Sequence, residues 1–456
     1  MDRRKMLGEM PLFPLLLKQS IPAMTGMLVM ASYNIVDTLF VGWGVGPLAI
    51  AATSAAFPIQ MFTSALAMFS AMGTASRASR NLGAGNDAEA ESSLGNGFVL
   101  SFILGMLNLI IGMLFMNQLI HICGGSAPEL QPLMREYLSI IFLGTPVSAL
   151  AMLFNNSIRA EGNMRYAMGS MIIPSVVNTV LDPIFIFGFK MGIAGAAWAT
   201  VLSQVCMFLW NVRYYTSGRT TNLIKLRLSR MKPRFAVLKE ICTIGLSEFI
   251  RQTAISISGA LAMNQIARYG NSLYVAAVGL VFRINSLAIM PVFGIGQGLQ
   301  PIVGYCYGAK QYTRARKASE IAILMATVVV VVLEAFSLIF APTLVRLFTN
   351  DPELITIGAP VLRTIQLGLF VVGVQITGTV VFQALGIALP ALVLSLSRQI
   401  LFFIPLMAIL PPLFGIYGAL WVYPISDLSS FLLTATMLYL YRKKFSHPEL
   451  LAQEAH

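Results

Sequence analysis

Apolar runs, each about as long as a membrane crossing, follow one another along nearly the whole chain. A transmembrane helix needs about 20 mostly apolar residues, because the hydrocarbon core of a bilayer is about 30 Å thick. The connections between the runs are short, so we expect no separate soluble domain. The pattern predicts twelve transmembrane helices, at residues 15–40, 48–74, 93–118, 133–158, 165–188, 192–214, 238–266, 273–298, 319–345, 356–384, 390–411 and 415–441.

The composition agrees with a membrane environment. Of 456 residues, 57% are apolar and 11% are charged, whereas ordinary soluble domains have about 45–50% and about 25%. The first apolar run continues through a full span without a small-residue cleavage site, so we expect the first helix to be retained. The four cysteines show no CxxC spacing, which favours structural thiols over disulfides or a metal site.

The net charge of +12 is explained by membrane topology. If both termini are cytoplasmic, the segments on the cytoplasmic side hold 22 of the 31 lysines and arginines. This is the positive-inside pattern of membrane proteins. The basic residues are therefore expected to contact anionic lipid headgroups, and no nucleic-acid partner is predicted.

The second half of the chain repeats the first at a nearly constant offset in residue number. One such match would be unremarkable, but several in the same order indicate a duplication. The matching pairs are AATSAAFPI (51–59) with AAVGLVFRI (276–284), Gly73 with Gly298, Gly83-Ala84 with Gly308-Ala309, Pro128-Glu129-Leu130 with Pro352-Glu353-Leu354, and Trp198 with Trp421.

Each copy contains six predicted helices, so both copies enter the membrane in the same orientation. The expected fold class is an all-α integral membrane protein with twelve transmembrane helices, in two six-helix lobes related by parallel internal duplication. We assign residues 1–214 to the N-terminal lobe, 215–236 to a basic cytoplasmic linker and 237–456 to the C-terminal lobe. Parallel repeats of this kind are a recurring transporter plan, with the substrate site between the halves.

The apolar stretch VVNTVLDPIFIFG (176–188) carries polar residues at membrane depth. Asn178 and Asp182 are four residues apart and share a helix face. Pro183 removes a backbone donor and can free carbonyl oxygens beside the carboxylate. Because an ionisable side chain in a bilayer is costly, such residues are usually functional. The alternative is that Asp182 is hydrogen-bonded as structural glue between helices.

A second embedded carboxylate lies in the first helix, in SYNIVDTLFVG, where Asn34 and Asp37 share a face. If Asp37 and Asp182 face one cavity, they can carry a proton. With Asn178 and Thr200 they can instead supply oxygen ligands for Na⁺. The residues leave this choice open.

Other embedded charges are weaker candidates. Glu248 precedes Arg251 by three residues, which favours an intrahelical ion pair. Glu334 stands alone in an apolar run, and Arg398 has no obvious partner in the sequence. Asp427 follows a proline in the second copy and is kept as a candidate.

Enzyme signatures are absent from the sequence. It contains no GxxxxGK[ST] phosphate loop, no HExxH motif and no GxSxG elbow. We therefore expect no enzyme activity and no cofactor. Without an ATP site in this chain, uphill transport would be driven by an ion gradient.

Several stretches resemble the multidrug and toxic compound extrusion (MATE) family, in family order and over nearly the whole chain. They are QSIPAM, NIVDTLFVG, SRNLGAGNDAEA, RAEGN, VVNTVLDPIFIFGFKMGIAGAAWATVLSQ and VGYCYGAKQYTRARKA. The fifth is the most specific and looks like the DinF branch, close to its MepA-like members. The resemblance implies a multidrug efflux antiporter that exports cationic drugs and dyes in exchange for H⁺ or Na⁺. We further expect a monomer in the bacterial inner membrane, and the distribution of basic residues predicts that both termini are cytoplasmic.

The resemblance also implies site residues. Pro22 matches the family's first-helix proline associated with bending. Asn34 and Asp427, identified above from the residues alone, are expected with it as substrate-contacting or hinge residues. The C-terminal acidic residues of the NorM branch have no counterpart in ISISGA and VVFQALG, so that branch's cation site is not expected. The residues that match the DinF-type coupling-ion site, which would also hold Na⁺, are Asp37, Asn178, Asp182 and Thr200, with either Asn155 or Asn156.

The two lobes are predicted to be unequal. The offset that aligns Gly73 with Gly298 places Ala262 opposite Asp37, and a slightly smaller offset places Ile404 opposite Asp182. The coupling chemistry is therefore expected in the N-terminal lobe alone.

Two rival functions remain. A lipid-linked precursor flippase of the same superfamily would want further helices and embedded basic residues, which are few here. An intramembrane aspartyl protease also uses two membrane aspartates, but it needs a GxGD stretch that neither VDTL nor LDPIF supplies.

Overall fold

The computed structural model is built of helices and describes residues 3–124, 128–217, 222–227, 230–347, 349 and 351–444. All four cysteines are free, as the sequence predicts. In chain order the elements are α1 (Arg3–Glu9), α2 (Leu12–Gly44), α3 (Pro47–Gly83), α4 (Asp87–Leu114), α5 (Met116–Gly124), α6 (Leu130–Ala160), α7 (Met164–Pro183), η1 (Ile184–Gly188), α8 (Gly192–Thr216), α9 (Phe235–Tyr269), α10 (Ser272–Gly308), α11 (Tyr312–Ile339), α12 (Ala341–Arg346), α13 (Pro352–Gln366), η3 (Leu369–Val371), α14 (Val372–Leu385), α15 (Ala388–Leu396), η4 (Ser397–Phe403) and α16 (Ile404–Lys444).

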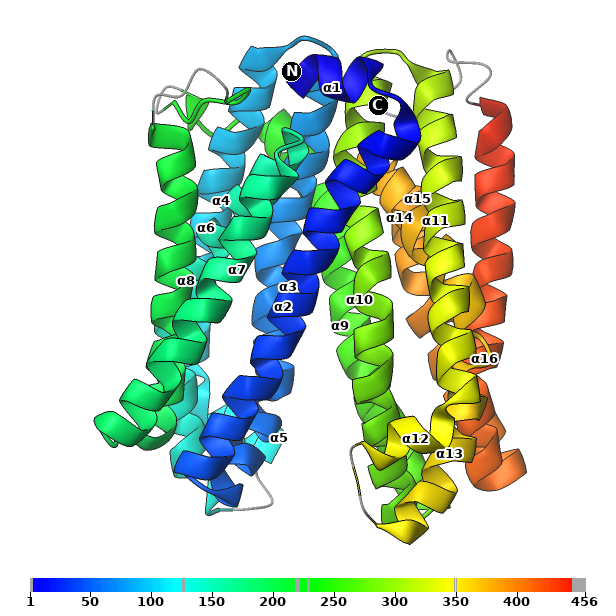
Figure 1. Ribbon diagram of the computed structural model, residues 1–456. Helices are drawn as coiled ribbons and strands as arrows, with labels where there is room; N and C mark the ends of the chain where they lie inside the picture. Colours follow the sequence, from blue (N-terminus) through cyan, green and yellow to red (C-terminus); the bar gives the residue numbers. More distant parts are fainter. Residues whose placement is uncertain are drawn as a thin grey trace.

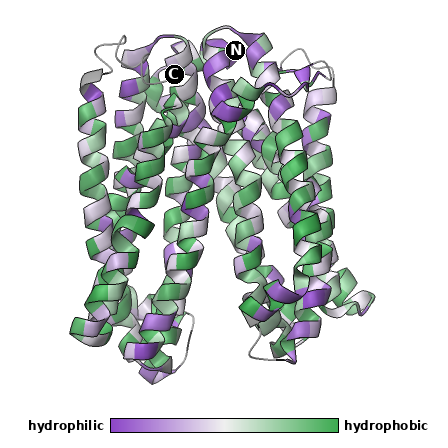
Figure 2. Ribbon diagram, turned by 180° about the vertical axis from the view of Figure 1, so that it is seen from behind, coloured by the Kyte–Doolittle hydropathy of each residue, from purple (hydrophilic) through white to green (hydrophobic). Residues whose placement is uncertain are grey.

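The helices form two lobes that stand side by side. Helices α2 to α8 make the N-lobe and α9 to α16 make the C-lobe (Figure 1). The end of the molecule that carries α1 and the last turns of α16 is called the basic end below. The ribbons of the two lobes meet near the basic end and diverge toward the other end (Figure 1). Hydrophobic residues dominate the middle of the helices, and hydrophilic residues gather toward their ends (Figure 2). This distribution suits a multi-pass membrane protein.

The described residues include ten helical segments that are long and apolar enough to cross a membrane. The prediction of twelve crossings differs from this number for two reasons. Helix α9 has 35 residues but carries charges such as Glu240, Glu248 and Arg251, which lower its mean hydropathy. The last segment, Ala388–Arg442, has 55 residues and holds two crossings, because Gly415 breaks it with φ 61° and ψ −143°.

The helix boundaries differ from the sequence prediction by several residues. The first crossing runs over Leu12–Gly44 instead of 15–40. The predicted helix at 356–384 is interrupted between α13 and α14 by the 3₁₀ turn η3. A window of apolar residues locates a crossing but does not show where the backbone bends, because bends depend on neighbouring helices as well as on local sequence.

The predicted linker at 215–236 overlaps the end of α8 and the start of α9 by two residues each, and its residues 218–221 and 228–229 fall outside the described part of the chain. Part of the rest is fastened to the N-lobe. Ile224 is fully buried. The backbone amide of Leu223 donates to Glu161 over 3.0 Å, and Arg227 pairs with Glu91 at 3.4 Å. The linker therefore packs against the basic end of the N-lobe.

Glu161, just after α6, joins three separate segments at the basic end. It is 0% exposed. Its carboxylate accepts hydrogen bonds from the Tyr214 hydroxyl at 2.9 Å and from Leu223, and it lies 3.4 Å from the Arg3 guanidinium. Burial raises the pKa of Glu161 to about 7, against the opposing effects of the Tyr214 and Leu223 hydrogen bonds and the Arg3 charge.

This raised pKa predicts a pH dependence of stability. Because folding favours the protonated carboxyl, its contribution is fully present below the ordinary pKa of 4.5 and is lost as the pH rises to about 7. We expect the melting temperature of the wild-type chain, relative to Glu161→Gln, to fall by a few degrees between pH 5 and pH 7.5. Differential scanning fluorimetry of both purified proteins checks this, and parallel pH curves for the two would contradict it.

Candidate functional site

The apolar stretch around Asp182 ends one helix and begins an irregular turn. Helix α7 ends at Pro183, and the chain continues as a π-helical turn, Ile184–Gly188. Proline has no backbone N–H to donate, so the regular helical pattern cannot continue past it unchanged. Such π turns inside helices are frequent at functional sites. The local sequence therefore places the Asp182 carboxyl beside a disturbed backbone.

Asn178 and Asp182 lie on the same face of α7, as predicted, and are 1% and 0% exposed. The Asn178 amide donates to the Asp182 carboxylate over 3.4 Å and to the Thr200 hydroxyl of α8 over 3.5 Å. Thr200 itself donates to the backbone carbonyl of Ala196 at 3.0 Å. The three predicted residues are thus brought together by two neighbouring helices.

Asp37 completes this group from α2, which packs against α7. Its carboxyl is in hydrogen-bonding contact with that of Asp182. The name carboxylate site is used below for Asp37, Asn178, Asp182 and Thr200. Two carboxylates this close repel each other when both are charged, and apolar surroundings strengthen the repulsion.

Several oxygens of the carboxylate site have no hydrogen-bond partner within the described part of the chain. They are one oxygen each of Asp37, Asn178 and Asp182, all buried. A buried polar atom without a partner costs free energy, so buried groups are normally satisfied. The arrangement can accept a proton, a water molecule or a small cation.

Two tyrosines near the carboxylate site were not predicted. Tyr33 of α2 and Tyr137 of α6 both interact electrostatically with Asp37 and Asp182. Tyr137 also accepts a hydrogen bond from Gln60 of α3 at 2.7 Å. Tyr33 precedes Asp37 by four residues, so the shared helix face was a usable signal. Nothing in the sequence connects Tyr137 or Gln60 to this site.

Other predicted residues do not join the carboxylate site through any described interaction. Asn155 donates to the Ala167 carbonyl and the Ser170 hydroxyl, both at the start of α7. Asn156 donates to the Met152 carbonyl within α6. The Asn155 amide therefore joins α6 to α7, whereas the Asn156 amide bonds within α6. Pro22 lies within α2, which continues unbroken across it. The side chain of Asn34 lies outside the described part.

Asp427, the candidate in the second copy, is paired with a base. It is 1% exposed, and its carboxylate lies 2.6 Å from the Arg398 guanidinium of η4. Arg398 therefore has the partner that the sequence did not reveal. The pair neutralises both charges, which distinguishes Asp427 from the two acids of the carboxylate site.

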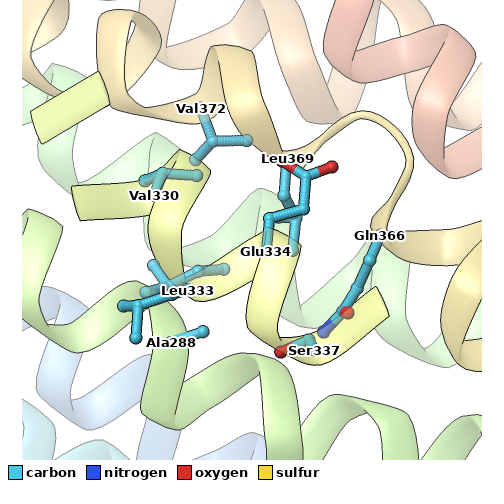
Figure 3. Close-up of a pocket in the computed structure, with 9 residues that line it drawn as sticks. Ala288, Val330, Leu333, Glu334, Ser337, Gln366, Leu369 and Val372 are labelled. Atoms are coloured by element: carbon cyan, nitrogen blue, oxygen red, sulfur yellow. The ribbon is translucent and has the colours of Figure 1, made fainter. Parts of the chain in front are cut away.

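Glu248 and Glu334 also have structural partners. Glu248 pairs with Arg251 at 2.5 Å, which confirms the predicted intrahelical ion pair. Glu334 accepts a hydrogen bond from the backbone amide of Phe370 in η3. It also lines a small C-lobe cavity, where Figure 3 shows its carboxylate directed toward Leu369 and away from the polar ends of Ser337 and Gln366. These oxygens do not converge on one point, so we assign no ligand to this cavity.

The ion pair between Asp427 and Arg398 generates a stability prediction. Asp427→Asn leaves Arg398 without its counter-ion. Breaking a fully buried pair costs about 3–5 kcal/mol, and the Arg398 side chain is 31% exposed, so we expect a smaller loss of about 1–2 kcal/mol. Adding Arg398→Gln to Asp427→Asn should restore most of it. Thermal unfolding of the single and double variants tests this; a double variant less stable than Asp427→Asn would contradict the pairing.

A model of the MatE family matches residues 22–184 and 249–409 of the chain. The two matched segments fall on the two lobes, in agreement with the duplication predicted from the sequence. Together they cover more than half of the chain. The aspartyl protease alternative is set aside by this match, because the family consists of transporters.

Relatives and solved structures agree with the family match over nearly the full length. The chain is 26% identical to the multidrug export protein MepA of Staphylococcus haemolyticus, over 96% of both chains. It is 39% identical to the MATE multidrug transporter DinF-BH, whose structure was solved in a complex, with a TM-score of 0.88 and coverage of 95% and 96%. A MATE structure described as the straight conformation is 26% identical with a TM-score of 0.92, covering 98% and 99%. The chain is therefore a member of the MATE transporter family, of its DinF branch and similar to MepA.

Proposed function

We propose that the chain exports cationic amphipathic drugs and dyes in exchange for H⁺, with the coupling group at Asp37 and Asp182 of the N-lobe. The observation that carries this proposal is the contact between two embedded carboxyls that have no basic partner among the described residues, together with their unsatisfied oxygens. A proton shared between the two carboxyls removes their repulsion and satisfies one of those oxygens.

The geometry favours H⁺ over Na⁺ as the coupling ion. A bound Na⁺ requires several oxygens directed at one point, and the Thr200 hydroxyl oxygen already accepts from the Asn178 amide at 3.5 Å. Asn178 directs its N–H groups, and not its oxygen, toward Asp182 and Thr200. A direct hydrogen bond between carboxyls, in contrast, needs one proton.

The charge of the carboxylate site supports a cationic substrate. When the shared proton leaves, the N-lobe holds a negative charge at membrane depth, which attracts a cation and repels an anion. The Asp427 charge in the C-lobe is neutralised by Arg398. Relatives named as multidrug export proteins and a similar structure named as a MATE multidrug transporter support drug export over lipid-precursor flipping.

Helix α2 is the proposed moving element, because it carries both Pro22 and Asp37. Proline removes one hydrogen bond from a helix and so lowers the cost of bending there. The helix is unbroken here, and the chain is similar both to a MATE structure described as straight and to one described as bent. We propose that protonation at Asp37 favours the bent form, which changes the shape of the drug site.

We further propose that the basic end faces the cytoplasm of a bacterial inner membrane and that the chain works as a monomer surrounded by lipid. The concentration of lysine and arginine at that end follows the positive-inside rule. Because the lobes meet at this end, the conformation is then outward-facing. One similar structure, with 27% identity and a TM-score of 0.88, is described as outward-facing.

The coupling role predicts that Asp37→Asn and Asp182→Asn each abolish drug-driven H⁺ counterflow in proteoliposomes while expression stays normal. An amide has nearly the shape of a carboxyl but cannot take up and release a proton. The matched control is Asp427→Asn with Arg398→Gln, which also removes an embedded C-lobe carboxylate and should retain most of the counterflow.

The same assay separates the two ions. With a pH gradient and no Na⁺, wild-type transport should proceed at its full rate. If transport instead requires Na⁺, then Na⁺ and not H⁺ is the coupling ion. Full counterflow in Asp182→Asn, or its loss only in the control, would show that the coupling site is elsewhere.

The proposed orientation predicts which positions are reachable from outside the cell. In a cysteine-free background, we choose His121→Cys on α5 and Thr313→Cys in the first turn of α11, both at exposed positions. Helix α5 and the start of α11 lie at opposite ends of the molecule (Figure 1). A membrane-impermeant thiol reagent added to intact cells should label the cysteine at 121 only. Labelling at 313 only would show that the chain has the opposite orientation in the membrane.

A further inference from the structure

The two lobes meet backbone to backbone near the basic end. A Cβ atom on Gly83 of α3 would lie 1.9 Å from the carbonyl oxygen of Tyr305 in α10, and one on Gly308 of α10 would lie 1.8 Å from that of Arg80 in α3. No side chain fits at either position. The two glycines occupy equivalent positions in the two copies of the duplicated sequence, so each is the counterpart of the other.

A second pair of duplicated glycines makes the same kind of contact. A Cβ on Gly73 of α3 would lie 2.1 Å from the carbonyl oxygen of Ile241 in α9, and one on Gly298 of α10 would lie 2.8 Å from the amide nitrogen of Ser20 in α2. Each lobe thus presses a glycine of its second long helix against the first long helix of the other lobe. These contacts all lie in the halves of α2, α3, α9 and α10 nearest the basic end (Figure 1).

The close packing does not continue toward the other end. Gly259 of α9 and Gly279 of α10 have no atom within 4 Å of the position of a Cβ. The ribbons of the two lobes also diverge toward that end (Figure 1), so the lobes are closed on each other near the basic end. A protein that moves a substrate across a membrane by alternating access must open this end at some point in its cycle.

Charged groups cross the same interface. One carboxylate of the C-lobe, Glu240 of α9, lies 2.6 Å from Arg77 and 2.7 Å from Arg80, both on α3 of the N-lobe. Arg77 also pairs with Glu89 of α4 at 2.8 Å, which holds it in place. Charge-assisted hydrogen bonds of this length are among the stronger polar contacts in proteins.

These ion pairs were not duplicated with the glycines. In the second copy, the positions equivalent to Arg77 and Arg80 are Ile302 and Tyr305, neither of which is charged. The symmetric glycines set how closely the lobes can approach. The ion pairs of Glu240 add an attraction across the contact between α3 and α9, next to the pair that Arg234, at the start of α9, makes with Glu89 of α4.

We propose that Arg77, Arg80 and Glu240 form an interlobe latch that holds the basic end closed, and that Glu240 must leave both arginines before the lobes can part there. This proposal rests on the proposed transport function in one respect, namely that the basic end opens during the transport cycle. The Glu240 side chain is 37% exposed, whereas those of Arg77 and Arg80 are 11% and 13% exposed. Water can therefore replace the lost hydrogen bonds on the carboxylate, which makes release reversible.

The test compares Glu240→Gln with the wild-type chain by hydrogen–deuterium exchange of the purified, full-length protein, without drug or ion gradient. Losing a charge-assisted contact should raise the ratio of open to closed molecules at the basic end by on the order of tenfold. We expect faster exchange in residues 73–84 and 235–246. We also expect slower exchange at the opposite end, in residues 38–50 and 262–274, because the lobes approach there as they part at the basic end.

Two further variants sharpen the result. Glu320→Gln removes a carboxylate that pairs with Arg316 and Arg442 at the same end but within the C-lobe, and it should leave exchange unchanged at both ends. Glu240→Asp keeps the charge and should lie closer to wild type than Glu240→Gln.

The inference is overturned if Glu240→Gln exchanges as the wild type does, if it accelerates exchange at the basic end without slowing it at the other end, or if Glu320→Gln has the same effect. The first result would show that these residues do not hold the lobes together. The second would show that Glu240 only stiffens its own surroundings, and the third that any surface charge at this end has the same effect. None of these results depends on the coupling ion, so a failure of H⁺ coupling at Asp182 remains a separate finding.

Discussion

Two carboxyl groups in contact within an apolar bundle are the constraint on which the functional part of this structure depends. Asp37 and Asp182 come from different helices, and their charges cannot both be present at that separation without a proton or a cation to offset them. The site is therefore stable when the two carboxyls share a proton, and it attracts positive charge when both are ionised. The π turn after Pro183 and the Asn178 amide adjust the local backbone and hydrogen bonds around this pair.

The helices and the two acids were predictable from sequence for the same physical reason. A bilayer supplies no hydrogen bonds, so the backbone must satisfy itself by forming long helices, and apolar runs of the right length are visible in any sequence. The same solvent makes a carboxylate within such a run costly, which brought Asp37 and Asp182 to attention. The spacing of Asn178 and Asp182 then indicated a shared helix face, as found.

Contacts between helices were not predictable in this way. Asp427 and Arg398 are well separated in the sequence and lie on different elements, and no periodicity connects them. Tyr137 reaches the carboxylate site from α6 for reasons of packing alone. Either Asn155 or Asn156 was expected to match the family pattern, but the Asn155 amide bonds to the start of α7 and the Asn156 amide bonds within α6. The break at Gly415 was predicted, since the last two expected helices end at 411 and begin at 415, but the interruption of the expected helix at 356–384 by η3 was missed.

The duplication kept some features in both copies and others in one, and the structure gives a physical basis for the difference. A backbone-to-backbone contact fails if either surface carries a side chain, so Gly83 and Gly308 are both needed for the lobes to close. A coupling site needs only one cavity with the right charge. The position opposite Asp37 is Ala262, which is fully buried and packs in the C-lobe core. A carboxylate at position 262 would have to be neutralised, and it would not help the lobes to close. One lobe can therefore carry the titratable groups, while the other lobe provides the surface against which the first one moves.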